Sequence, residues 1–513
     1  MAEAHEELCD VAIVGFGPVG ATLANLLALQ GLRVLVFERE AEVYRLPRAV
    51  HFDGECMRVF QAVGIADELM SGLVVAPGMR FVDAAGRVLI DWQRPTTIGP
   101  QGWHASYRFH QPTLESALRR RLAQHPGVRV ALRHDVFCID EKDGAVHLRH
   151  EDLSNGRLGS SRARWVVGCD GARSLVRRFM GTELDDLRSH ERWLVVDLIL
   201  KRPRPDLGDY SVQFCDPRRP ATYVRGPGDR RRWELMLMPG DDLVEMTRPE
   251  RIWSLLERWV TPQDAVLERP AVYTFHSVVA RGWRRGRLLI AGDAAHQTPP
   301  FLGQGMCAGI RDAANLAWKL AAIVGGSAPP ALLESYESER APHVREFIET
   351  AVRLGAVIQS TDAAAAARRD EAMAANPQAF ATPQPRLGPG AYDGQPDCAG
   401  TLALQPVLAD GRRLDDDIGY RAALLVRPAS AQQAALLLGD REPAAVDCRL
   451  VVAEAAAVQA VLDDCRAEAV LLRPDRQVFG IAAEREEIAG LLRRAAALGV
   501  VRPPLPGQAG PAG

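Results

Sequence analysis

A glycine-rich segment near the N-terminus constrains the fold more than any other part of the chain. An apolar run, Val11–Val14, leads directly into the sequence GFGPVG, and a helix-like segment follows. A second strand pattern, residues 33–37, ends at Glu38. This order of strand, glycine turn, helix and strand with a terminal acid is typical of the first βαβ unit of a dinucleotide-binding sheet.

The three glycines and the acid have separate expected roles. Gly15 makes the tight turn, Gly17 lets the backbone approach a pyrophosphate, and Gly20 lets the helix pack against the strand. The Glu38 carboxylate can accept hydrogen bonds from the adenosine ribose, and it would repel a 2′-phosphate. The bound dinucleotide is therefore expected to be FAD or NAD rather than NADP. The alternative is a glycine turn that binds no ligand.

A second stretch, residues 287–320, has the features of a cofactor cradle. A buried-strand pattern, Leu288–Ala291, breaks at Gly292 and Asp293, and a loop rich in Gly and Pro leads into a long helix. A carboxylate thus leaves the end of a strand, and backbone amides follow where a helix starts. Because helix N-termini favour negative charge, this arrangement suits a polyol and a partly anionic ring system.

Composition excludes several other classes of protein. The 513 residues have a net charge of -3, with 47% hydrophobic and 25% charged residues, which gives no footprint for nucleic acid or an anionic membrane. No apolar run is long enough to span a bilayer, and the acidic start MAEAHEELCD does not resemble a signal peptide. The nine cysteines are scattered without a CxxC, which favours a reducing cytoplasm and argues against a bound metal.

Three later regions have patterns of their own. A strand, Trp165–Gly168, leads into CDGARS, where Asp170 could bind a cofactor or cap the following helix. Residues 193–238 have strand patterns without helical periodicity, which predicts an antiparallel sheet inserted into the α/β part. Residues 362–392 are rich in Ala, Arg, Pro and Gln, which is typical of a linker, and a small α/β unit follows from residue 400.

Three signatures in order, GFGPVG with Glu38, CDGARS and GDAAHQTPPFLGQG, resemble those of the single-component FAD-dependent aromatic-ring hydroxylases of the p-hydroxybenzoate hydroxylase type. The resemblance covers residue 8 to about residue 350, and the three signatures together are highly specific. Within that family the chain is most similar to the hydroxylases of 3-(3-hydroxyphenyl)propionate, in the stretches PRAVHFDGECMRVFQAVG, WLVVDL, RRWELMLMPGDD and LLRPDRQVFG. The C-terminal unit resembles the thioredoxin-like appendage of phenol hydroxylases without its CxxC, which favours a structural or dimer-supporting role.

The resemblance implies an α/β fold with a Rossmann-like FAD-binding domain, an inserted antiparallel-sheet substrate domain and a C-terminal thioredoxin-like α/β unit. The expected boundaries are residues 1–78, 101–185 and 285–360 for the FAD-binding domain, 79–100 and 186–284 for the substrate domain, 361–395 for the linker, and 396–513 for the C-terminal domain.

It also implies cofactor-binding residues in four groups. These are Gly15, Gly17, Pro18, Gly20, Glu38 and Arg39 at the ADP half; Arg48 and Gln111 on the flavin side; Asp170 and Arg173 in the motif linked to FAD and NAD(P)H; and Gly292, Asp293, Gly303, Gly305, Met306 and Cys307 around the ribityl chain and the flavin ring. The residues alone leave open whether Arg48 faces a cofactor or simply caps this surface. Pro300 would lie beside the isoalloxazine, where the substrate stacks.

The implied reaction is ortho-hydroxylation of a phenol by way of a C4a-hydroperoxyflavin, with O2 and a transiently bound NADH or NADPH. The expected substrates are 3-(3-hydroxyphenyl)propionate and 3-hydroxycinnamate, which give 2,3-dihydroxy products in aromatic catabolism. Two alternatives stay open. One is a related hydroxylase for another phenol, of the resorcinol or polyketide-tailoring type, and the other is a non-catalytic flavin-binding redox scaffold. A homodimer is compatible with both.

The base that deprotonates the phenol is harder to assign. The candidates are His296, Tyr223, His276 and His104, and for His296 a structural role on the flavin side is the favoured interpretation. On the expected sheet, Arg225 could bind a propionate carboxylate, or it could be a solvated charge at a turn.

Overall fold

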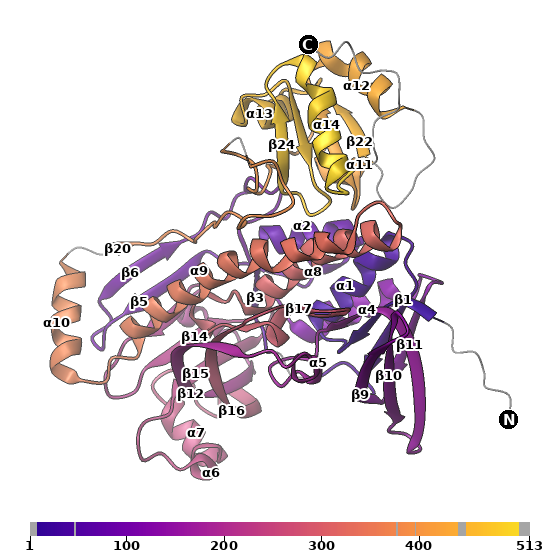
Figure 1. Ribbon diagram of the computed structural model, residues 1–513. Helices are drawn as coiled ribbons and strands as arrows, with labels where there is room; N and C mark the ends of the chain where they lie inside the picture. The colour runs from indigo at the N-terminus through magenta and orange to yellow at the C-terminus, as the bar shows by residue number, and fades with distance from the viewer. Residues whose placement is uncertain (1–7, 46–47, 376–377, 395–396, 440–447, 502–513) are drawn as a thin grey trace.

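The computed structural model describes residues 8–45, 48–375, 378–394, 397–439 and 448–501. Figure 1 shows their arrangement. Residues 1–7, on which most of the signal-peptide argument rests, lie outside the described residues, as does the end of the expected C-terminal domain, residues 502–513. No helix in the described part of the chain combines the length and the apolar character needed to cross a membrane.

The first sheet has the strand order β17-β18-β11-β1-β2-β8, with β10 and β9 added beside β11. Its centre is parallel, because β1 pairs in parallel with β2 and β11, β2 with β8, and β11 with β18. The strands are β1 (Leu8–Val14), β2 (Val34–Glu38), β8 (Val128–Leu132), β9 (His134–Lys142), β10 (Ala145–Asp152), β11 (Arg157–Gly168), β17 (Arg284–Arg285) and β18 (Leu288–Ile290). This is the expected Rossmann-like arrangement, and the predicted α/β class is confirmed.

Helices cover this sheet, and α8 lies at their centre. Every residue of α8 from Cys307 to Ala322 is buried, as expected for a helix that has neighbours on all sides. The helices of this part are α1 (Pro18–Leu29), α2 (Gly54–Val63), α3 (Ala66–Met70), α4 (Gln111–Leu122), α5 (Leu175–Met180), η2 (Gly292–Ala294), η3 (Pro300–Leu302), α8 (Gly305–Val324), η4 (Pro330–Leu333) and α9 (Glu334–Ile358).

A second sheet has nine described strands in the order β19-β16-β12-β15-β14-β13-β5-β6-β20. The predicted antiparallel pairing is present from β19 to β13 and between β5 and β6, while β13–β5 and β20–β6 are parallel because these partners come from distant parts of the chain. The strands are β5 (Gly78–Val82), β6 (Val88–Gln93), β12 (Leu184–Leu200), β13 (Ser211–Phe214), β14 (Ala221–Arg225), β15 (Arg230–Met236), β16 (Ala265–Ala280), β19 (His296–Gln297) and β20 (Gln378–Ala379).

The two faces of the nine-stranded sheet have different neighbours. One face packs under η1 (Pro205–Leu207), α6 (Leu243–Met246) and α7 (Pro249–Leu256), and its apolar cluster includes Trp233 and Leu256. The other face packs against η3 and α9. A small sheet, β3 (His51–Asp53), β7 (Ser106–Arg108) and β4 (Val74–Val75), lies close to this second face, since Arg108 bonds to Ser211.

The region expected to be a linker contains ordered elements. Helix α10 (Ala363–Ala374) begins at Asp362, whose carboxylate accepts a hydrogen bond of 2.6 Å from Ala365 N. Strand β20 then pairs with β6, and Met373 and Phe380 join the apolar cluster on that side of the nine-stranded sheet. The structure differs from the expectation here because alanine has the highest helix propensity, so a run of alanines needs only a cap to become helical.

The C-terminal unit forms a four-stranded mixed sheet in the order β22-β21-β23-β24, and it lies beside α2, α8 and α9 in Figure 1. Its likeness to thioredoxin stays a prediction. The elements are α11 (Leu414–Ile418), β21 (Ala422–Val426), η5 (Pro428–Ser430), α12 (Ala431–Leu438), β22 (Cys448–Val452), α13 (Ala456–Asp464), β23 (Ala469–Leu472), β24 (Val478–Ala482), η6 (Arg485–Glu487) and α14 (Ile488–Ala497).

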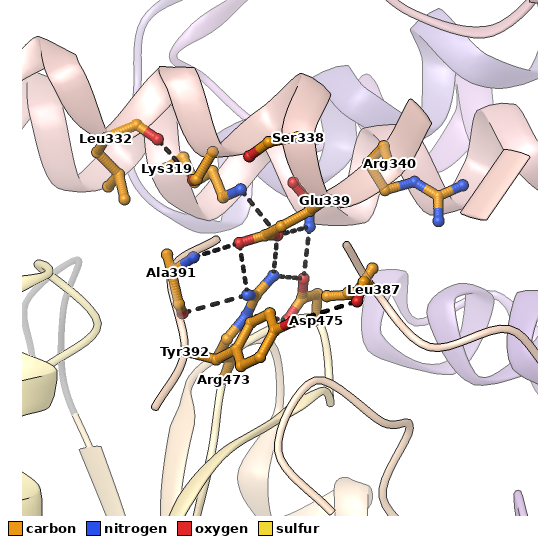
Figure 2. A network of polar contacts seen from close by, with 12 residues as sticks. Lys319, Leu332, Ser338, Glu339, Arg340, Leu387, Ala391, Tyr392, Arg473 and Asp475 are labelled. Atoms are coloured by element: carbon orange, nitrogen blue, oxygen red, sulfur yellow. Dashed lines mark hydrogen bonds and ion pairs between the residues drawn. The ribbon is translucent and has the colours of Figure 1, made fainter. Parts of the chain in front are cut away.

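A network of buried charges joins this unit to the two long helices (Figure 2). Glu339 on α9 accepts from Lys319 on α8 at 2.9 Å and from Arg473, which follows β23, at 2.8 Å. Arg473 also pairs with Asp475 at 2.5 Å. The side chains of Lys319, Glu339 and Arg473 are fully buried, and that of Asp475 is 4% exposed. Two cations thus meet two anions, and we refer to these four residues as the balanced network.

Candidate functional site

The glycine turn lies at the carboxyl end of β1. Gly15 has a φ of 100°, which residues with a side chain rarely adopt, and a Cβ there would lie 2.4 Å from the Cys169 carbonyl oxygen. A Cβ on Gly20 would lie 2.1 Å from the Gly15 oxygen. At Gly17, in contrast, a Cβ would meet no described atom within 4 Å. The turn is closed at Gly15 and Gly20 and open at Gly17, as close approach of a pyrophosphate requires.

Helix α1 begins beside this opening. Gly17 is its N-cap and provides no side-chain cap, and Pro18 occupies the first turn, where a missing N–H is no loss. At the end of β2, the Glu38 carboxylate accepts hydrogen bonds from Phe16 N at 2.8 Å and from Glu40 N. Glu38 therefore stands at the turn and holds it in shape. The neighbouring Arg39 side chain is exposed and lies 3.4 Å from the Glu40 carboxylate, outside the turn.

The CDGARS segment lies next to this turn. One Asp170 carboxylate oxygen accepts from Leu175 N at 2.6 Å and from Val176 N at 3.2 Å, while the other is buried and has no partner among the described residues. Burial raises the pKa of Asp170. Asp170 was expected either to bind a cofactor or to cap the following helix. The structure shows the capping hydrogen bonds, and the second carboxylate oxygen remains available to a ligand. Arg173 is exposed.

Sequence reasoning missed Arg177, three residues after the motif. Its guanidinium donates to the carbonyl oxygens of Ala172 at 2.7 Å and Ala294 at 2.8 Å. It therefore holds the CDGARS segment against the Gly292-Asp293 turn. No local pattern marks this residue, because both partners are backbone atoms and one is distant in sequence.

Asp293 occupies an unusual position. Protein surrounds the carboxylate and desolvation raises its pKa, against the opposing charges of Arg48 and His296, yet the side chain is classed as exposed. Its neighbour Gly292 has a φ of 61°, and a Cβ there would lie 3.0 Å from Val19 of α1. Asp293 thus follows a glycine that packs against α1, and its carboxylate is within the influence of Arg48.

His296, in contrast, is fully enclosed. Its Nε2 lies 2.6 Å from an Asp312 carboxylate oxygen, and both side chains are fully buried. Asp312 also accepts from Gly292 N and pairs with Arg340 at 3.0 Å. Burial alone would raise the pKa of Asp312, but His296 and Arg340 lower it below its ordinary value. This geometry supports the structural interpretation of His296 over the catalytic one.

The loop after Asp293 leads into the N-terminus of α8. Pro300 is half-buried, and Gly303 has a φ of 65°. Helix α8 has no side-chain cap, and a Cβ on Gly305 would meet no described atom within 4 Å. The amides of the half-buried Met306 and the buried Cys307 belong to this uncapped first turn. The helix dipole favours an anion there.

Arg48 and Gln111, both expected on the flavin side, come together in the structure. The Gln111 side-chain oxygen accepts from Arg48 N at 2.9 Å and Ala49 N at 2.7 Å, and its amide donates to Glu115. Arg232 donates to the Arg48 carbonyl oxygen at 2.8 Å. Gln111 is thus engaged in shaping the loop, and the loop leaves the Arg48 side chain exposed near Asp293.

These features fit a flavin dinucleotide. Two uncapped helix N-termini, of α1 and α8, each carry a glycine with open space around it, and the exposed Asp293 follows β18. The first can take a pyrophosphate, the carboxylate can accept from a polyol, and the second can face an anionic ring edge.

Two of the expected site residues, Tyr223 and Arg225, lie on the face of the nine-stranded sheet that points away from Pro300. Tyr223 pairs opposite Trp233 and Arg225 opposite Arg231, so both face α7. Tyr223 is 3% exposed, with its hydroxyl 3.5 Å from the Gly208 oxygen, and Arg225 pairs with Asp209 at 2.5 Å. This placement argues against direct contact of either residue with a substrate at Pro300. The remaining base candidates, His276 and His104, stay predictions.

The face toward Pro300 carries residues that sequence reasoning did not find. Ser211, Gln213 and Thr222 lie on this face, and two buried arginines, Arg94 and Arg108, reach it from the β5–β6 hairpin and from β7. The only local signal was an arginine between aromatic residues in a strand-like segment, Tyr107 to Phe109.

The fold also brings Asp53, Cys56 and Cys307 within 4.8 Å of one another, a geometry that a metal could use. Asp53 is paired with Arg311 at 2.5 Å, and burial raises the pKa of the Cys56 thiol. The carboxylate is occupied and the thiol is held protonated. The expectation of no metal was based on spacing in the sequence and did not anticipate this cluster.

The fold and the cradle define a flavin-binding protein, and comparisons with known proteins give its family. The family described as FAD binding domain matches residues 8–351. The chain is 38% identical to a "Probable NADH-specific resorcinol 4-hydroxylase" of Rhodococcus jostii (strain RHA1), over 98% of each protein. It is 40% identical to a "3-(3-hydroxy-phenyl)propionate/3-hydroxycinnamic acid hydroxylase" of Mycobacterium sp. (strain KMS), over 71% of this chain and 62% of that relative.

The chain belongs to this family, that of the FAD-dependent aromatic-ring hydroxylases. The predictions of the family and of FAD as cofactor are confirmed. A solved structure of the flavin-dependent monooxygenase PieE in complex with FAD and substrate has the same fold, with a TM-score of 0.82 over 96% of this chain and 99% of that one, at 22% identity.

Proposed function

We propose that this protein is a monooxygenase that uses NADH and O2 to hydroxylate a small phenol ortho to its hydroxyl group. The preferred substrates are 3-(3-hydroxyphenyl)propionate and 3-hydroxycinnamate. The observation that carries the proposal is the cradle of Gly17, Asp293 and the α8 N-terminus in a chain whose relatives, at 36% to 40% identity, are named for these substrates. NADH is preferred as the reductant because the relative that matches the whole chain is named NADH-specific.

Each part of the cradle has a task in this reaction. Bound FAD supplies the hydride acceptor and the activation of O2, which a phenol ring alone lacks. Gly17 and α1 hold the pyrophosphate, and Asp293 accepts from the ribityl hydroxyls. The amides of Met306 and Cys307 stabilise negative charge at the edge of the ring, a preorganised electrostatic effect. Pro300 and the buried face of the nine-stranded sheet exclude water from the reacting atoms.

Resorcinol is the second candidate substrate. The full-length match to the named resorcinol hydroxylase favours it, since the Mycobacterium relative is matched over only 62% of its length. Resorcinol carries no carboxylate, so the two candidates differ in charge. The cytoplasmic location and the homodimer stay predictions, as do the domain boundaries.

One experiment separates these functions. Purified holoenzyme is given NADH and a panel of phenols, and NADH oxidation, O2 uptake and catechol product are measured together. We expect 3-(3-hydroxyphenyl)propionate to stimulate NADH oxidation and to be converted to its 2,3-dihydroxy product. A resorcinol response alone would transfer the assignment to the second candidate. A flavin-loaded protein that forms no hydroxylated product from any phenol would be the redox scaffold instead.

A further inference from the structure

A cluster of polar side chains lies between the small sheet and the nine-stranded sheet. His51 of β3 pairs opposite Arg108 of β7, so the two residues share a face. The Arg94 guanidinium donates to His51 Nε2 at 2.7 Å and to the Ser106 hydroxyl at 2.6 Å. Arg108 donates to the hydroxyl of Ser211 on β13. These contacts join three strands from distant parts of the chain.

The two arginines are buried without an acidic partner. Arg94 is 9% exposed and Arg108 is 4% exposed, and within the described part of the chain neither forms an ion pair with a carboxylate. The acid closest in influence to Arg94 is Asp53, and it already pairs with Arg311. Arg94 lies over the Trp92 ring at 4.3 Å, which offsets part of its burial. Arg108 Nε has no described partner at all.

Such a charge is costly to keep in a protein interior. Burial lowers the pKa of Arg94 to about 10 and that of Arg108 to about 9, and the charge of Arg94 contributes to the lower pKa of Arg108. Buried charges in folded proteins are normally paired. Two unpaired cations side by side therefore indicate that a negative group occupies this position during function.

The cluster reaches the loop beside the flavin cradle. Since Arg94 donates to His51 Nε2, the proton of this neutral ring is on Nδ1, which donates to the Gly303 carbonyl oxygen at 3.1 Å. Burial, Arg94 and Arg108 hold the pKa of His51 well below its ordinary value, in agreement with a neutral ring. The cluster is thus one residue away from η3, which begins at Pro300.

We propose that Arg94 and Arg108 form the subsite for the carboxylate of an aromatic acid whose phenol ring lies against the Pro300–Gly303 loop. The proposal rests on the proposed function, and it selects acidic phenols over neutral ones. Arginine suits this task because its planar guanidinium binds a carboxylate through two hydrogen bonds and keeps its charge when buried. A propionate side chain supplies the carboxylate, and resorcinol does not.

The test compares an acid with its neutral amide. Dissociation constants of the holoenzyme are measured by calorimetry for 3-(3-hydroxyphenyl)propionate and its amide, and for 3-phenylpropionate and its amide, which carry no phenol. We expect the wild type to prefer each acid by about 100-fold, and Arg108→Met to reduce that preference to less than about 5-fold while the amides bind as before. Arg108→Lys should retain part of the preference. Arg219→Met, which removes an arginine of the β13–β14 loop that is already paired with Asp241, should keep all of it.

Several results would overturn the proposal. An acid preference that survives in both Arg108→Met and Arg94→Gln, or a wild type that binds no acid more tightly than its amide, would do so. If Arg108→Met weakened acid and amide equally and lowered the flavin midpoint potential, the charges would serve the reduced flavin instead. If Arg225→Met lost the acid preference while the Arg94 and Arg108 variants kept it, the subsite would lie on the other face of the sheet.

This test is independent of turnover. A wild type that prefers acids in the binding assay but forms no catechol would retain the subsite and refute the proposed reaction. A wild type that forms the catechol with an acid preference insensitive to both arginines would do the reverse. Should Arg108→Met fail to fold, which circular dichroism and flavin content report, Arg108→Lys and Arg94→Gln carry the measurement.

Discussion

The balanced network and the arginine pair are both buried groups of charge, and they differ in how that charge is compensated. In the balanced network two cations meet two carboxylates within 2.9 Å (Figure 2). Among the described residues, Arg94 and Arg108 contact a neutral histidine, serine hydroxyls and the Trp92 ring, and no carboxylate pairs with either. The first group joins two parts of the fold, and the second lies beside the Pro300–Gly303 loop.

The difference separates structural charge from functional charge. A network that compensates itself needs nothing from outside, and its loss affects the fold. A pair of buried like charges without counter-charges lowers the stability of the folded protein until a ligand of opposite charge binds. Removing a charge from the balanced network should therefore lower the free energy of unfolding, and removing one of the two unpaired arginines should raise it.

The largest expected effect is on the balanced network. Glu339→Gln removes the carboxylate that both Lys319 and Arg473 contact and leaves buried positive charge in excess. We expect a loss of roughly 3–5 kcal/mol in the free energy of unfolding of the region around the two helices. Urea unfolding followed by tryptophan fluorescence measures it, because Arg473 lies 5.0 Å from the Trp318 ring. Asp410→Asn, which disrupts an exposed pair with Arg412, is the control and should leave the midpoint unchanged. An unchanged midpoint in Glu339→Gln would contradict the structural role.

The same network predicts a dependence on pH. Burial alone would raise the pKa of Glu339, but Arg473 and Lys319 lower it from 4.5 to about 2. A carboxylate with a lowered folded-state pKa stabilises the protein fully above its unfolded pKa and loses that contribution as the pH falls toward the folded value. The loss between pH 5 and pH 2 should be about 3 kcal/mol. The stability difference between wild type and Glu339→Gln, measured in urea at several pH values, should shrink over this window. A constant difference would be inconsistent with it.

Asp293 extends the comparison to a single unpaired anion. Its raised pKa and exposed side chain indicate a carboxylate that awaits hydrogen-bond donors. We expect Asp293→Ala to weaken FAD binding by about 10- to 100-fold, since hydrogen bonds to a charged group contribute roughly 1.5–3 kcal/mol. Flavin fluorescence titration of the apoprotein measures the affinity, and thermal melting of the apoprotein should show no loss of stability. Unchanged FAD affinity would remove Asp293 from the cofactor site.

Removing an unpaired cation should have the opposite sign to Glu339→Gln. Arg108→Met replaces a buried charge by an apolar chain of similar length, and we expect the ligand-free protein to gain roughly 1 kcal/mol. The matched control is Arg340→Met, because Arg340 is equally buried but pairs with Asp312 at 3.0 Å, and it should destabilise by about 3 kcal/mol. Urea unfolding without substrate compares the two. If both variants lost the same stability, Arg108 would be an ordinary structural charge.

The parts of this site that sequence could predict are those determined locally. Gly17 and Asp293 lie directly after strands, so the strand–turn–helix pattern was sufficient to find them. Arg94 and Arg108 become neighbours only when a hairpin and a short strand meet in the fold, and no spacing in the sequence records that contact. The sequence also could not predict on which face of the sheet a strand residue lies, because a shift of one residue in the strand register moves every side chain to the opposite face. Tyr223 was one candidate for the base and Arg225 one candidate for a carboxylate-binding residue, and both face α7.

Arg225 gives the smallest expected effect, and it completes the comparison. It is a half-buried arginine on the same sheet as Ser211, but it pairs with Asp209 at 2.5 Å on the face that packs against α7. Partly exposed pairs of this kind contribute up to about 1 kcal/mol, so Arg225→Met should shift the urea midpoint only slightly. Its preference for an acid over the matching amide should equal that of the wild type, in calorimetric titrations run beside Arg108→Met. If Arg225→Met lost that preference and Arg108→Met kept it, then the pairing of a charge would not distinguish function from structure in this protein.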